Sequence, residues 1–266
     1  MYALDGSFLD TIEEVVLRAR TLVPSSLDDL VTWTKTNLSG EPEAVTAIDI
    51  AVGQLLVEAL LARYPGAAVV NEESSVDMRA LDSDLCFVID PIDGTQEFIK
   101  GSPHFSISVA VVSRRQVTHA VVLYPASGRI LRARRGAGAM EGGQPLLRAS
   151  WQGPQLRLGT SPKDTMSPRL IALRRDFAEL GIHAIPALTP KVGAVLSGDV
   201  DVALSLSSVA RLWDFAAIAL IAREAGLAFT DLEGQDLLAR LPAAHADGWI
   251  VADRSLLDAV LLRLQH

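Results

Sequence analysis

In the stretch "CFVIDPIDGTQEFIKG", residues 86–101, polar residues follow directly after a short apolar run. The run at residues 86–89 is typical of a buried strand. Asp90 and Asp93 follow it on either side of a proline turn, and a glycine and a threonine come next. Proline and glycine fix a turn at the end of the strand, so both carboxylates can reach one shared centre. We therefore interpret this strand end as a candidate functional site.

The first half of the chain is predicted to combine two helices with a set of largely paired strands. Apolar residues recur at helical spacing over residues 8–23 and 46–65. Runs rich in β-branched residues predict strands, with Arg114 and Arg115 at one of the turns between them. The expected strands cover residues 67–71, 86–90, 105–113 and 117–125, followed by a hairpin over residues 128–146 with Gly142 and Gly143 at its tip.

From about Trp151 onward, helices and strands alternate along the sequence. This pattern favours an α/β arrangement, so we expect an α+β domain over residues 1–150 and an α/β domain over residues 151–266. The segment "ASWQGPQ", residues 149–155, is the predicted join. The expected elements are strands over 156–161, 183–187 and 200–206, two later strands, and helices over 167–180, 190–197, 213–225 and 255–264.

The composition is that of an ordinary globular protein. Its 266 residues suffice for one large or two small domains, and 49% are hydrophobic and 21% charged. The formal net charge of −8 argues against a nucleic-acid polymer as a partner, and a phosphate ester would need bound cations here. Cys86 is the only cysteine, so no internal disulfide can form. The N-terminus does not resemble a signal peptide, and no apolar run reaches the roughly 20 residues of a membrane helix. We expect a cytoplasmic protein that binds no membrane.

Acidic residues gather at the ends of the predicted elements. Carboxylates brought together repel each other and cannot all stay ionised without cations. Oxygen ligands without cysteine or histidine predict Mg²⁺ or Mn²⁺ rather than Zn²⁺. The carbonyl of Ile92 lies between two of these acids and is a further candidate ligand. The candidate acids are Asp49, Glu72, Glu73, Asp90, Asp93 and Asp214.

Plainer interpretations exist for each acid taken alone. Asp49 and Asp214 lie at helix starts, where single acids are usually caps. The segment "NEES" alone is typical of a solvated turn. A haloacid-dehalogenase-like phosphatase would need a nucleophilic aspartate two residues before Asp93, but that residue is Pro91. The four acidic segments together favour a metal site without a covalent intermediate.

The two residues that follow Asp93 in the sequence are suited to binding a phosphate group. If a helix begins after the turn, the N–H groups of Gly94 and Thr95 form an anion site at its N-terminus. The hydroxyl of Thr95 can orient a water molecule. Two metal ions that clamp an in-line displacement are a common phosphatase arrangement. The stretch therefore predicts a two-metal phosphatase centre.

Four motifs in order resemble the inositol monophosphatase superfamily of Mg²⁺-dependent, lithium-sensitive phosphomonoesterases. They span nearly the whole chain and read "VTAID" with Asp49, "NEES" with Glu72 and Glu73, "DPIDGT" from Asp90 to Thr95, and "WDFAA" from Trp213 to Ala217. The resemblance implies an alternating αβαβα sandwich of the inositol monophosphatase and fructose-1,6-bisphosphatase type. It also implies a homodimer.

The resemblance further implies a role for each site residue. Glu72, Asp90 and the Ile92 carbonyl would hold a first Mg²⁺ ion. Asp90, Asp93 and Asp214 would hold a second, and a third, weaker ion would also use Glu72. Thr95, linked to Asp49, would help to activate the attacking water. The N–H groups of Gly94 and Thr95 would bind the phosphate.

The substrate is expected to be a small phosphorylated metabolite. True inositol monophosphatases carry an acid seven residues before the "WD" aspartate, and Ser207 replaces it here, which argues against inositol phosphate. The continuation "TQEF" and Lys191 resemble the 3′(2′),5′-bisphosphate nucleotidase branch, in which Lys191 would bind the second phosphate. The plainer interpretation of Lys191 is an exposed lysine at a helix start. Ser207 stays a candidate hydrogen-bonding partner of the substrate.

The expected function is therefore metal-dependent hydrolysis of a phosphate ester by a metal-activated water, with adenosine 3′,5′-bisphosphate as the favoured substrate. Inositol-1-phosphate, histidinol phosphate and sugar bisphosphates are alternatives. A non-catalytic regulatory or binding protein on the same fold is a further alternative. Residues 35–43, from Lys35 to Glu43, have the composition of a mobile lid or of a plain surface loop.

Overall fold

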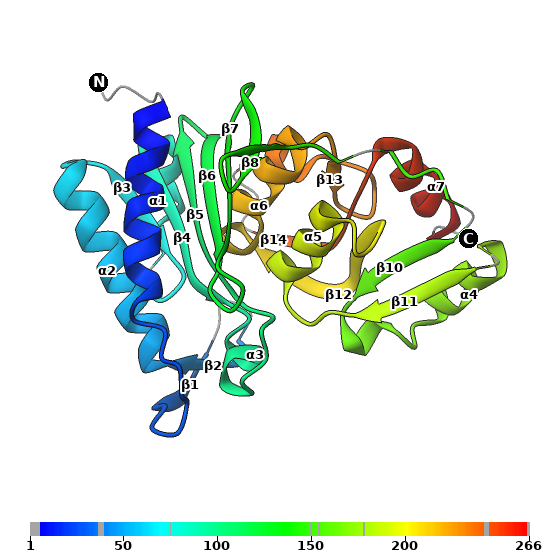
Figure 1. Ribbon diagram of the computed structural model, residues 1–266, viewed down its shortest axis with the longest axis horizontal. Coiled ribbons are helices and arrows are strands. Elements are labelled where there is room, and N and C mark those ends of the chain that lie inside the picture. Colours follow the sequence, from blue (N-terminus) through cyan, green and yellow to red (C-terminus); the bar gives the residue numbers. More distant parts are fainter. Residues whose placement is uncertain are drawn as a thin grey trace.

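Helices and sheets alternate across the molecule in layers (Figure 1). A pair of helices covers a seven-stranded sheet, a second pair lies between that sheet and a five-stranded one, and a third pair covers the far side. The predicted αβαβα sandwich is thus confirmed. The computed structural model describes residues 6–36, 40–74, 76–148, 150–153, 155–177, 179–241 and 245–264.

The first helical layer consists of α1 (Gly6–Arg20) and α2 (Ala47–Arg63). Their apolar residues recur every three to four positions, so one face of each helix packs on the seven-stranded sheet. The helix predicted over residues 8–23 ends earlier, at Arg20, where turn hydrogen bonds replace the helical ones. The side chain of Thr46 caps α2 by accepting from the N–H group of Asp49.

The seven-stranded sheet runs in the order β3-β4-β5-β6-β7-β8-β9, and its pairs are antiparallel except β3 with β4. Arg114 and Arg115 form the β5–β6 turn as predicted, both with positive φ. Residues 128–146 form three strands rather than one hairpin, with Gly142 and Gly143 between the last two. The strands are β3 (Ala68–Asn71), β4 (Cys86–Asp93), β5 (Ser106–Ser113), β6 (Gln116–Tyr124), β7 (Arg129–Arg134), β8 (Gly138–Glu141) and β9 (Gln144–Leu146).

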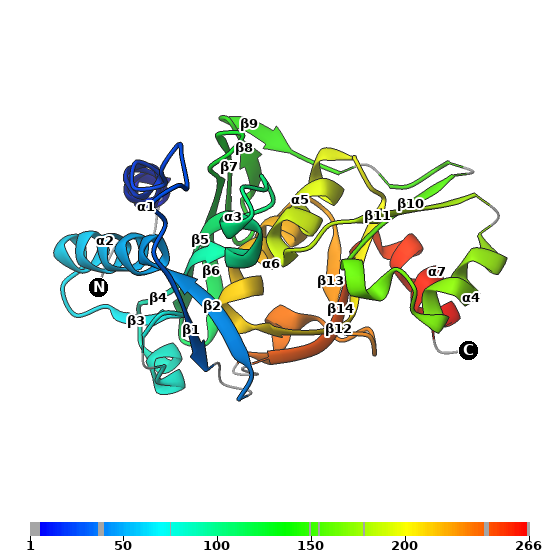
Figure 2. The same ribbon diagram turned by 90° about the horizontal axis from the view of Figure 1, so that it is seen from below.

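The middle layer holds α5 (Leu188–Ser197) and α6 (Leu212–Glu224), which lie between the two sheets in both ribbon views (Figure 2). Helix α6 is apolar almost all round, because the first sheet covers one side and the second half of the chain covers the other. A short helix, α3 (Thr95–Ile99), follows β4 directly.

The five-stranded sheet runs in the order β11-β10-β12-β14-β13, and α4 (Pro168–Asp176) and α7 (Arg254–Leu264) cover its outer face. The helix predicted to reach residue 180 is wrong beyond Asp176. Leu180 and Ile182 alternate with exposed residues as in a strand, and pair in parallel with β10. The strands are β10 (Leu156–Thr160), β11 (Leu180–Ala184), β12 (Val202–Arg211), β13 (Ala228–Thr230) and β14 (His245–Ala252).

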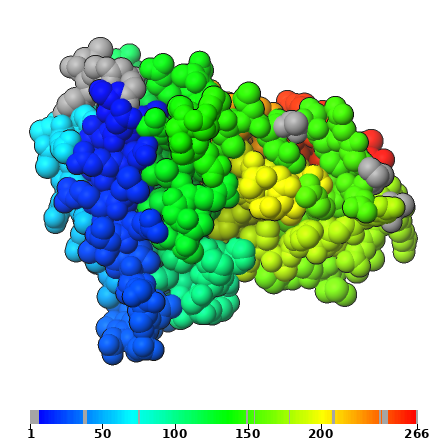
Figure 3. All heavy atoms as spheres, in the orientation of Figure 1, coloured from blue at the N-terminus to red at the C-terminus, as the bar shows by residue number. Residues whose placement is uncertain are grey.

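The segment expected to be a loop at residues 35–43 is instead part of a β-hairpin. Strands β1 (Thr32–Thr36) and β2 (Pro42–Thr46) pair antiparallel, with Lys35 opposite Glu43. The tip, residues 37–39, lies outside the described residues. In the space-filling view the blue hairpin projects beside α3 (Figure 3). Alternating threonines, Trp33 and Val45 favour strands here, and the composition of the tip obscured that pattern.

The two sheets come from opposite sides of residue 150, but they share a core. Helix α6 belongs to the second half of the chain and packs against strands of the first sheet. The division into domains at residue 150 stays a prediction. Among the described residues, no helix is long and apolar enough to cross a membrane.

Replacing Leu56 with alanine is expected to lower the free energy of unfolding by about 2–5 kcal/mol, because its side chain is wholly buried between α2 and the sheet. Leu17→Ala is the matched control, since Leu17 is 42% exposed and its loss should cost less than about 1 kcal/mol. Urea denaturation measures both. Equal losses in the two variants would contradict the assigned layer packing.

Candidate metal centre

An irregularity in β4 brings Asp90 and Asp93 to one side of the sheet. Asp90 pairs with Ser108 and Asp93 pairs with Ser106, so β4 places two residues opposite one residue of β5. Residues three apart in a regular strand point to opposite faces. The extra residue is a bulge, which returns both carboxylates to the same face. Pro91 is tolerated there because the bulge already interrupts the ladder of hydrogen bonds, so the missing N–H group of proline costs little.

Three carboxylates from separate elements meet at this strand end. Oxygen atoms of Glu72, Asp90 and Asp214 all lie within 4.8 Å of one another. Glu72 comes from the turn after β3, Asp90 from β4, and Asp214 from the first turn of α6. Asp93 and Ile92 line the same cavity, which has a volume of about 230 Å³. The sequence predicted this convergence, although the family resemblance assigned Glu72 and Asp214 to different ions.

A hard cation fits these residues. The Oδ1 atom of Asp90 is buried and has no hydrogen-bond partner in the described part of the chain. Burial, and then the neighbouring carboxylates, raise the pKa of Asp90 and of Asp214 well above the ordinary value. Burial also raises the pKa of Glu72 to about 7. A buried oxygen among acids is satisfied when a divalent cation binds, and an all-oxygen donor set suits Mg²⁺ or Mn²⁺.

Asp93 and Asp214 are each fixed by a backbone N–H group. The N–H group of Thr189, in the first turn of α5, donates to Asp93 Oδ2 at 2.7 Å. The N–H group of Arg211 donates to Asp214 Oδ2 at 2.6 Å. Burial raises the pKa of Asp93, and the Thr189 hydrogen bonds offset part of that rise. Each carboxylate is therefore oriented by the start of a helix.

Asp49 serves as a helix cap and as a partner of Thr95. Its Oδ2 atom accepts from the N–H group of Thr46 at 2.9 Å and from the Thr46 hydroxyl. Its Oδ1 atom accepts from the hydroxyl of Thr95 at 2.7 Å. The same hydroxyl lies 3.1 Å from the carbonyl oxygen of Ile92. Asp49 thus caps α2 and also forms the predicted pair with Thr95, with one oxygen for each.

Gly94 is required by the close approach of two other segments. Its φ is +92°, in the left-handed region. A Cβ atom would lie 2.7 Å from the carbonyl oxygen of His104 and 2.9 Å from the Cβ of Ala187. Only glycine fits this backbone without a clash. It caps α3, which begins at Thr95 as predicted.

Lys35 is a site residue that sequence analysis missed. From the β1–β2 hairpin, its ammonium group lies 3.2 Å from Glu72 and 2.6 Å from Glu73. Burial alone would lower the pKa of Lys35, but the charges of Glu72 and Glu73 raise it overall. Glu73 therefore pairs with Lys35, and the three-carboxylate group does not include it. No spacing in the sequence joins position 35 to position 72.

Lys191 borders the cavity but is not the exposed lysine of the plainer interpretation. It is 1% exposed, and its Nζ atom donates to Ser161 Oγ, to the Ile185 carbonyl and to the Pro186 carbonyl. The two carbonyl groups belong to the segment that leads into α5, and the serine follows β10. The role of Lys191 in binding a substrate stays a prediction.

Ser207 lies in a second bulge. Ser205 of β12 pairs with Trp249 of β14, and the next pair is Val209 with Asp247, so three residues oppose one. Ser207 is one of those three. It is exposed and does not line the cavity of the carboxylates.

The carboxylate of Asp164 binds this bulge. It accepts from the hydroxyl of Ser207 at 2.5 Å and from the hydroxyl of Ser205 and the N–H group of Leu206, both at 3.0 Å. Asp164 is only 3% exposed. Sequence analysis missed it, because nothing in its spacing points to the bulge.

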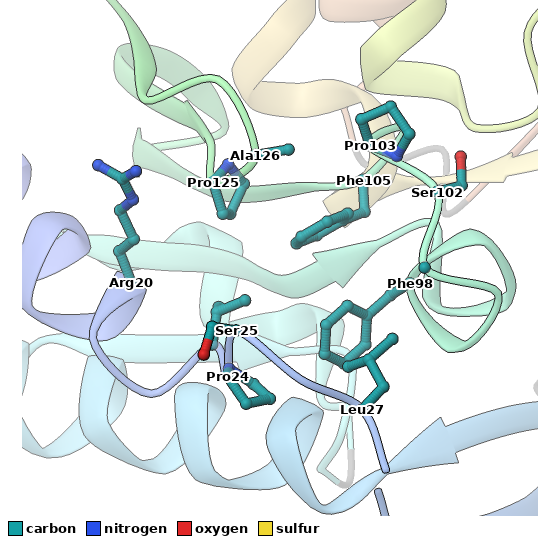
Figure 4. A pocket seen from close by; sticks show the side chains of 12 residues that line it. Arg20, Pro24, Ser25, Leu27, Phe98, Ser102, Pro103, Phe105, Pro125 and Ala126 are labelled. Atoms are coloured by element: carbon teal, nitrogen blue, oxygen red, sulfur yellow. The ribbon is translucent and has the colours of Figure 1, made fainter.

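A larger cavity, of about 470 Å³, is bordered by α3 and the loop that follows it (Figure 4). Phe98 and Phe105 form one of its walls, with ring centroids 5.0 Å apart, and Arg20 lies at one edge. Its lining, in the part of the chain that the structure describes, includes no aspartate or glutamate. The smaller cavity, with its converging carboxylates, is therefore the candidate centre.

Comparisons with known proteins place these features in a family. A sequence model of the inositol monophosphatase family matches residues 7–266. Nus factor SuhB of Pasteurella multocida (strain Pm70) is 33% identical over 218 residues, which cover 78% of this chain and 77% of the relative.

Solved structures share the fold over almost the whole chain. The extragenic suppressor protein suhB of Bartonella henselae has a TM-score of 0.81 and 23% identity, and the match covers 98% of this chain and 99% of that one. Inositol monophosphatase II of Staphylococcus aureus MSSA476 has a TM-score of 0.76 and 22% identity, over 96% and 91% of the two chains. Structures of SaIMPase-II with inositol monophosphate or 2′-AMP bound have TM-scores of 0.77 and 0.76 and identities of 21% and 22%, over 98% of this chain and 93% and 94% of those chains.

The raised pKa values predict how metal removal changes stability with pH. Between about pH 4, the ordinary range for Glu, and pH 7, folded Glu72 keeps a proton that the unfolded chain releases. The folded state then binds more protons, so the metal-free protein should lose stability as pH rises through this window. Mg²⁺ binds the ionised carboxylates and should add about 2.7 kcal/mol at 100 times its Kd. The melting-temperature difference between Mg²⁺ and EDTA samples should therefore widen from pH 5 to pH 8, and a constant difference would contradict the assignment.

Lys35→Met is expected to tighten Mg²⁺ binding about 5- to 10-fold, because the variant lacks a cation 3.2 Å from Glu72. Its melting temperature in EDTA should fall, since Glu72 and Glu73 lose the cation that pairs with both of them. Lys100→Met, which removes an exposed pair with Glu97, is the control. Calorimetric titration with Mg²⁺ measures the affinities. Weaker Mg²⁺ binding by Lys35→Met would show that Lys35 organises the site rather than competing with the ion.

Proposed function

The chain belongs to the inositol monophosphatase family, and on that basis we propose that it is a metal-dependent phosphomonoesterase that hydrolyses a small phosphate ester. The observation that carries the proposal is the meeting of Glu72, Asp90 and Asp214 within 4.8 Å. The buried, unpartnered Oδ1 atom of Asp90 supports a cation at this point. These features fit hydrolysis better than surface binding, which needs no buried acids.

Mg²⁺ is the proposed cofactor, and Mn²⁺ would fit the same oxygen donors. Bound ions would supply positive charge that lowers the pKa of a water molecule and stabilises the charge on the leaving oxygen. The residues that would hold two or three ions are Glu72, Asp90, Asp93, Asp214 and the carbonyl of Ile92.

The chain's own groups would orient the water and the phosphate. Because the Thr95 hydroxyl donates to Asp49, its oxygen can accept a hydrogen bond from the attacking water. Glu72, which lies in the same group of carboxylates, is the proposed second acceptor for that water. Gly94 and Thr95 line the cavity of the carboxylates, and their N–H groups are the proposed donors to the phosphate. An in-line attack then needs no covalent intermediate on the protein.

Adenosine 3′,5′-bisphosphate is the proposed substrate to test first. The 2′-AMP complex of SaIMPase-II, a fold relative, supports a nucleotide in such a site. Glu97 pairs with Lys100, and Phe98 packs on Phe105, so the Glu-Phe pair stabilises α3 in this protein. The nucleotide proposal therefore depends on the "TQEF" resemblance and on the 2′-AMP complex of that fold relative.

Inositol phosphate is the second candidate. The serine at position 207 argues against it, because its hydroxyl already donates to Asp164 and the residue lies outside the cavity of the carboxylates. The inositol monophosphate complex of SaIMPase-II supports this candidate. Histidinol phosphate and sugar bisphosphates are further candidates without a specific contact in their favour.

A regulatory or binding protein without catalysis is the alternative class. The relative from Pasteurella multocida carries the name Nus factor SuhB, and that name is the reason to keep this alternative. The complete set of carboxylates in this chain favours catalysis. A homodimer in solution is also proposed, from the family resemblance.

The test is phosphate release with Mg²⁺ across adenosine 3′,5′-bisphosphate, 2′-AMP, inositol-1-phosphate, histidinol phosphate and fructose-1,6-bisphosphate, with kcat/KM for each. Asp90→Asn should lower kcat/KM by at least about 100-fold with the melting curve intact, because even outer partners of a metal site are worth 10–100-fold. Asp84→Asn is the control, since Asp84 is exposed and pairs with Arg114. Wild-type turnover by folded Asp90→Asn would refute the metal assignment.

A further inference from the structure

Lys191 uses all of its hydrogen-bonding capacity inside the protein. An ammonium group has three protons. Its Nζ atom lies 2.8 Å from the Pro186 carbonyl oxygen, 3.0 Å from the Ile185 carbonyl oxygen and 3.1 Å from Ser161 Oγ. It also lies 5.5 Å from the centre of the Trp249 ring. A substrate phosphate could bind this group only by displacing one of these partners.

The serine that Lys191 binds begins a directed chain of hydrogen bonds. Ser205 donates to Asp164 at 3.0 Å, because a carboxylate can only accept. Ser161 therefore donates to Ser205 at 3.4 Å and accepts from Lys191. The chain connects a buried cation to a buried anion, so each charge is satisfied within the fold.

The two carbonyl groups held by Lys191 belong to a segment that touches the metal centre. Pro186 and Ala187 line the cavity of the carboxylates. The Cβ atom of Ala187 lies 2.9 Å from the position that a side chain on Gly94 would occupy. Two residues further on, the N–H group of Thr189 holds Asp93 at 2.7 Å. Lys191 and Asp93 are therefore connected through hydrogen bonds to one short backbone segment, residues 185–189.

We propose that Lys191 is a positioning residue, which holds residues 185–189 against Asp93 and so sets the geometry of the metal centre, rather than a contact for a second substrate phosphate. The proposal rests on the proposed function for its kinetic readout alone. Without the ammonium group, the carbonyls of Ile185 and Pro186 lose a charged donor, and the start of α5 is free to move away from Asp93. An outer-shell change of this kind weakens metal binding and turnover together.

The test is Lys191→Met, which keeps the length of the side chain but removes its donors. Calorimetric titration with Mg²⁺, without substrate, should show affinity reduced about 10- to 100-fold. At saturating Mg²⁺, kcat should fall by a similar factor for both adenosine 3′,5′-bisphosphate and 2′-AMP, with KM nearly unchanged. A rise in KM confined to the bisphosphate, with wild-type Mg²⁺ affinity, would overturn the proposal.

Two further variants complete the design. Lys163→Met is the matched control, because Lys163 is an exposed lysine of the same half of the chain and should leave Mg²⁺ affinity unchanged. An equal loss of Mg²⁺ affinity in both lysine variants would show that the effect follows from the change in net charge, and it would overturn the proposal. If Lys191→Met does not fold, Ser161→Ala removes one of the three acceptors and should weaken Mg²⁺ binding about 3- to 10-fold, the scale of one hydrogen bond. Unchanged affinity in folded Ser161→Ala would then overturn it.

The two proposals fail separately. If the wild-type protein hydrolyses none of the esters, the proposed function is wrong, but Mg²⁺ titration of wild type and Lys191→Met still decides the role of Lys191. If turnover is normal and the Mg²⁺ affinities of the two proteins agree, only the positioning role is wrong.

Discussion

Mutual repulsion of buried carboxylates is the constraint on which the rest of this structure depends. Glu72, Asp90 and Asp214 lie within 4.8 Å of one another, and burial raises the pKa of each. Such a cluster costs free energy unless cations or hydrogen bonds offset it. The protein holds it together with a bulged strand, two helix starts and a hairpin lysine, which come from four distant parts of the sequence.

The same acids link the layers of the fold to the chemistry. Asp214 and Asp49 both accept hydrogen bonds from backbone groups at the starts of their helices, and so fix where those helices begin. Helix α6 then carries Asp214 onto the seven-stranded sheet, beside Asp90. Structural capping and site formation are therefore two uses of one carboxylate, with one oxygen for each.

Sequence patterns predicted the features that depend on neighbouring residues. The apolar run before Asp90 and the helical spacing before Pro65 gave the correct elements, and oxygen ligands without histidine gave the type of metal site. The hairpin at Lys35 was missed because the composition of its tip is typical of a surface loop. The contact between Asp164 and Ser207 spans 43 positions and depends on a bulge, so no local pattern encodes it. The burial of Lys191 could not be predicted from the sequence either, because a lysine near a helix start is usually exposed.

The bulge in β4 means that the pairing of the motif matters as much as its residues. If the same sequence paired with β5 in a regular ladder, every ligand type would still be in the chain at the same spacing. One of the two carboxylates, three residues apart, would then point to the opposite face of the sheet. A relative with the same acids at the same spacing but without the bulge would therefore keep the composition of this centre and lose its geometry, and an inventory of ligands alone would not reveal the loss.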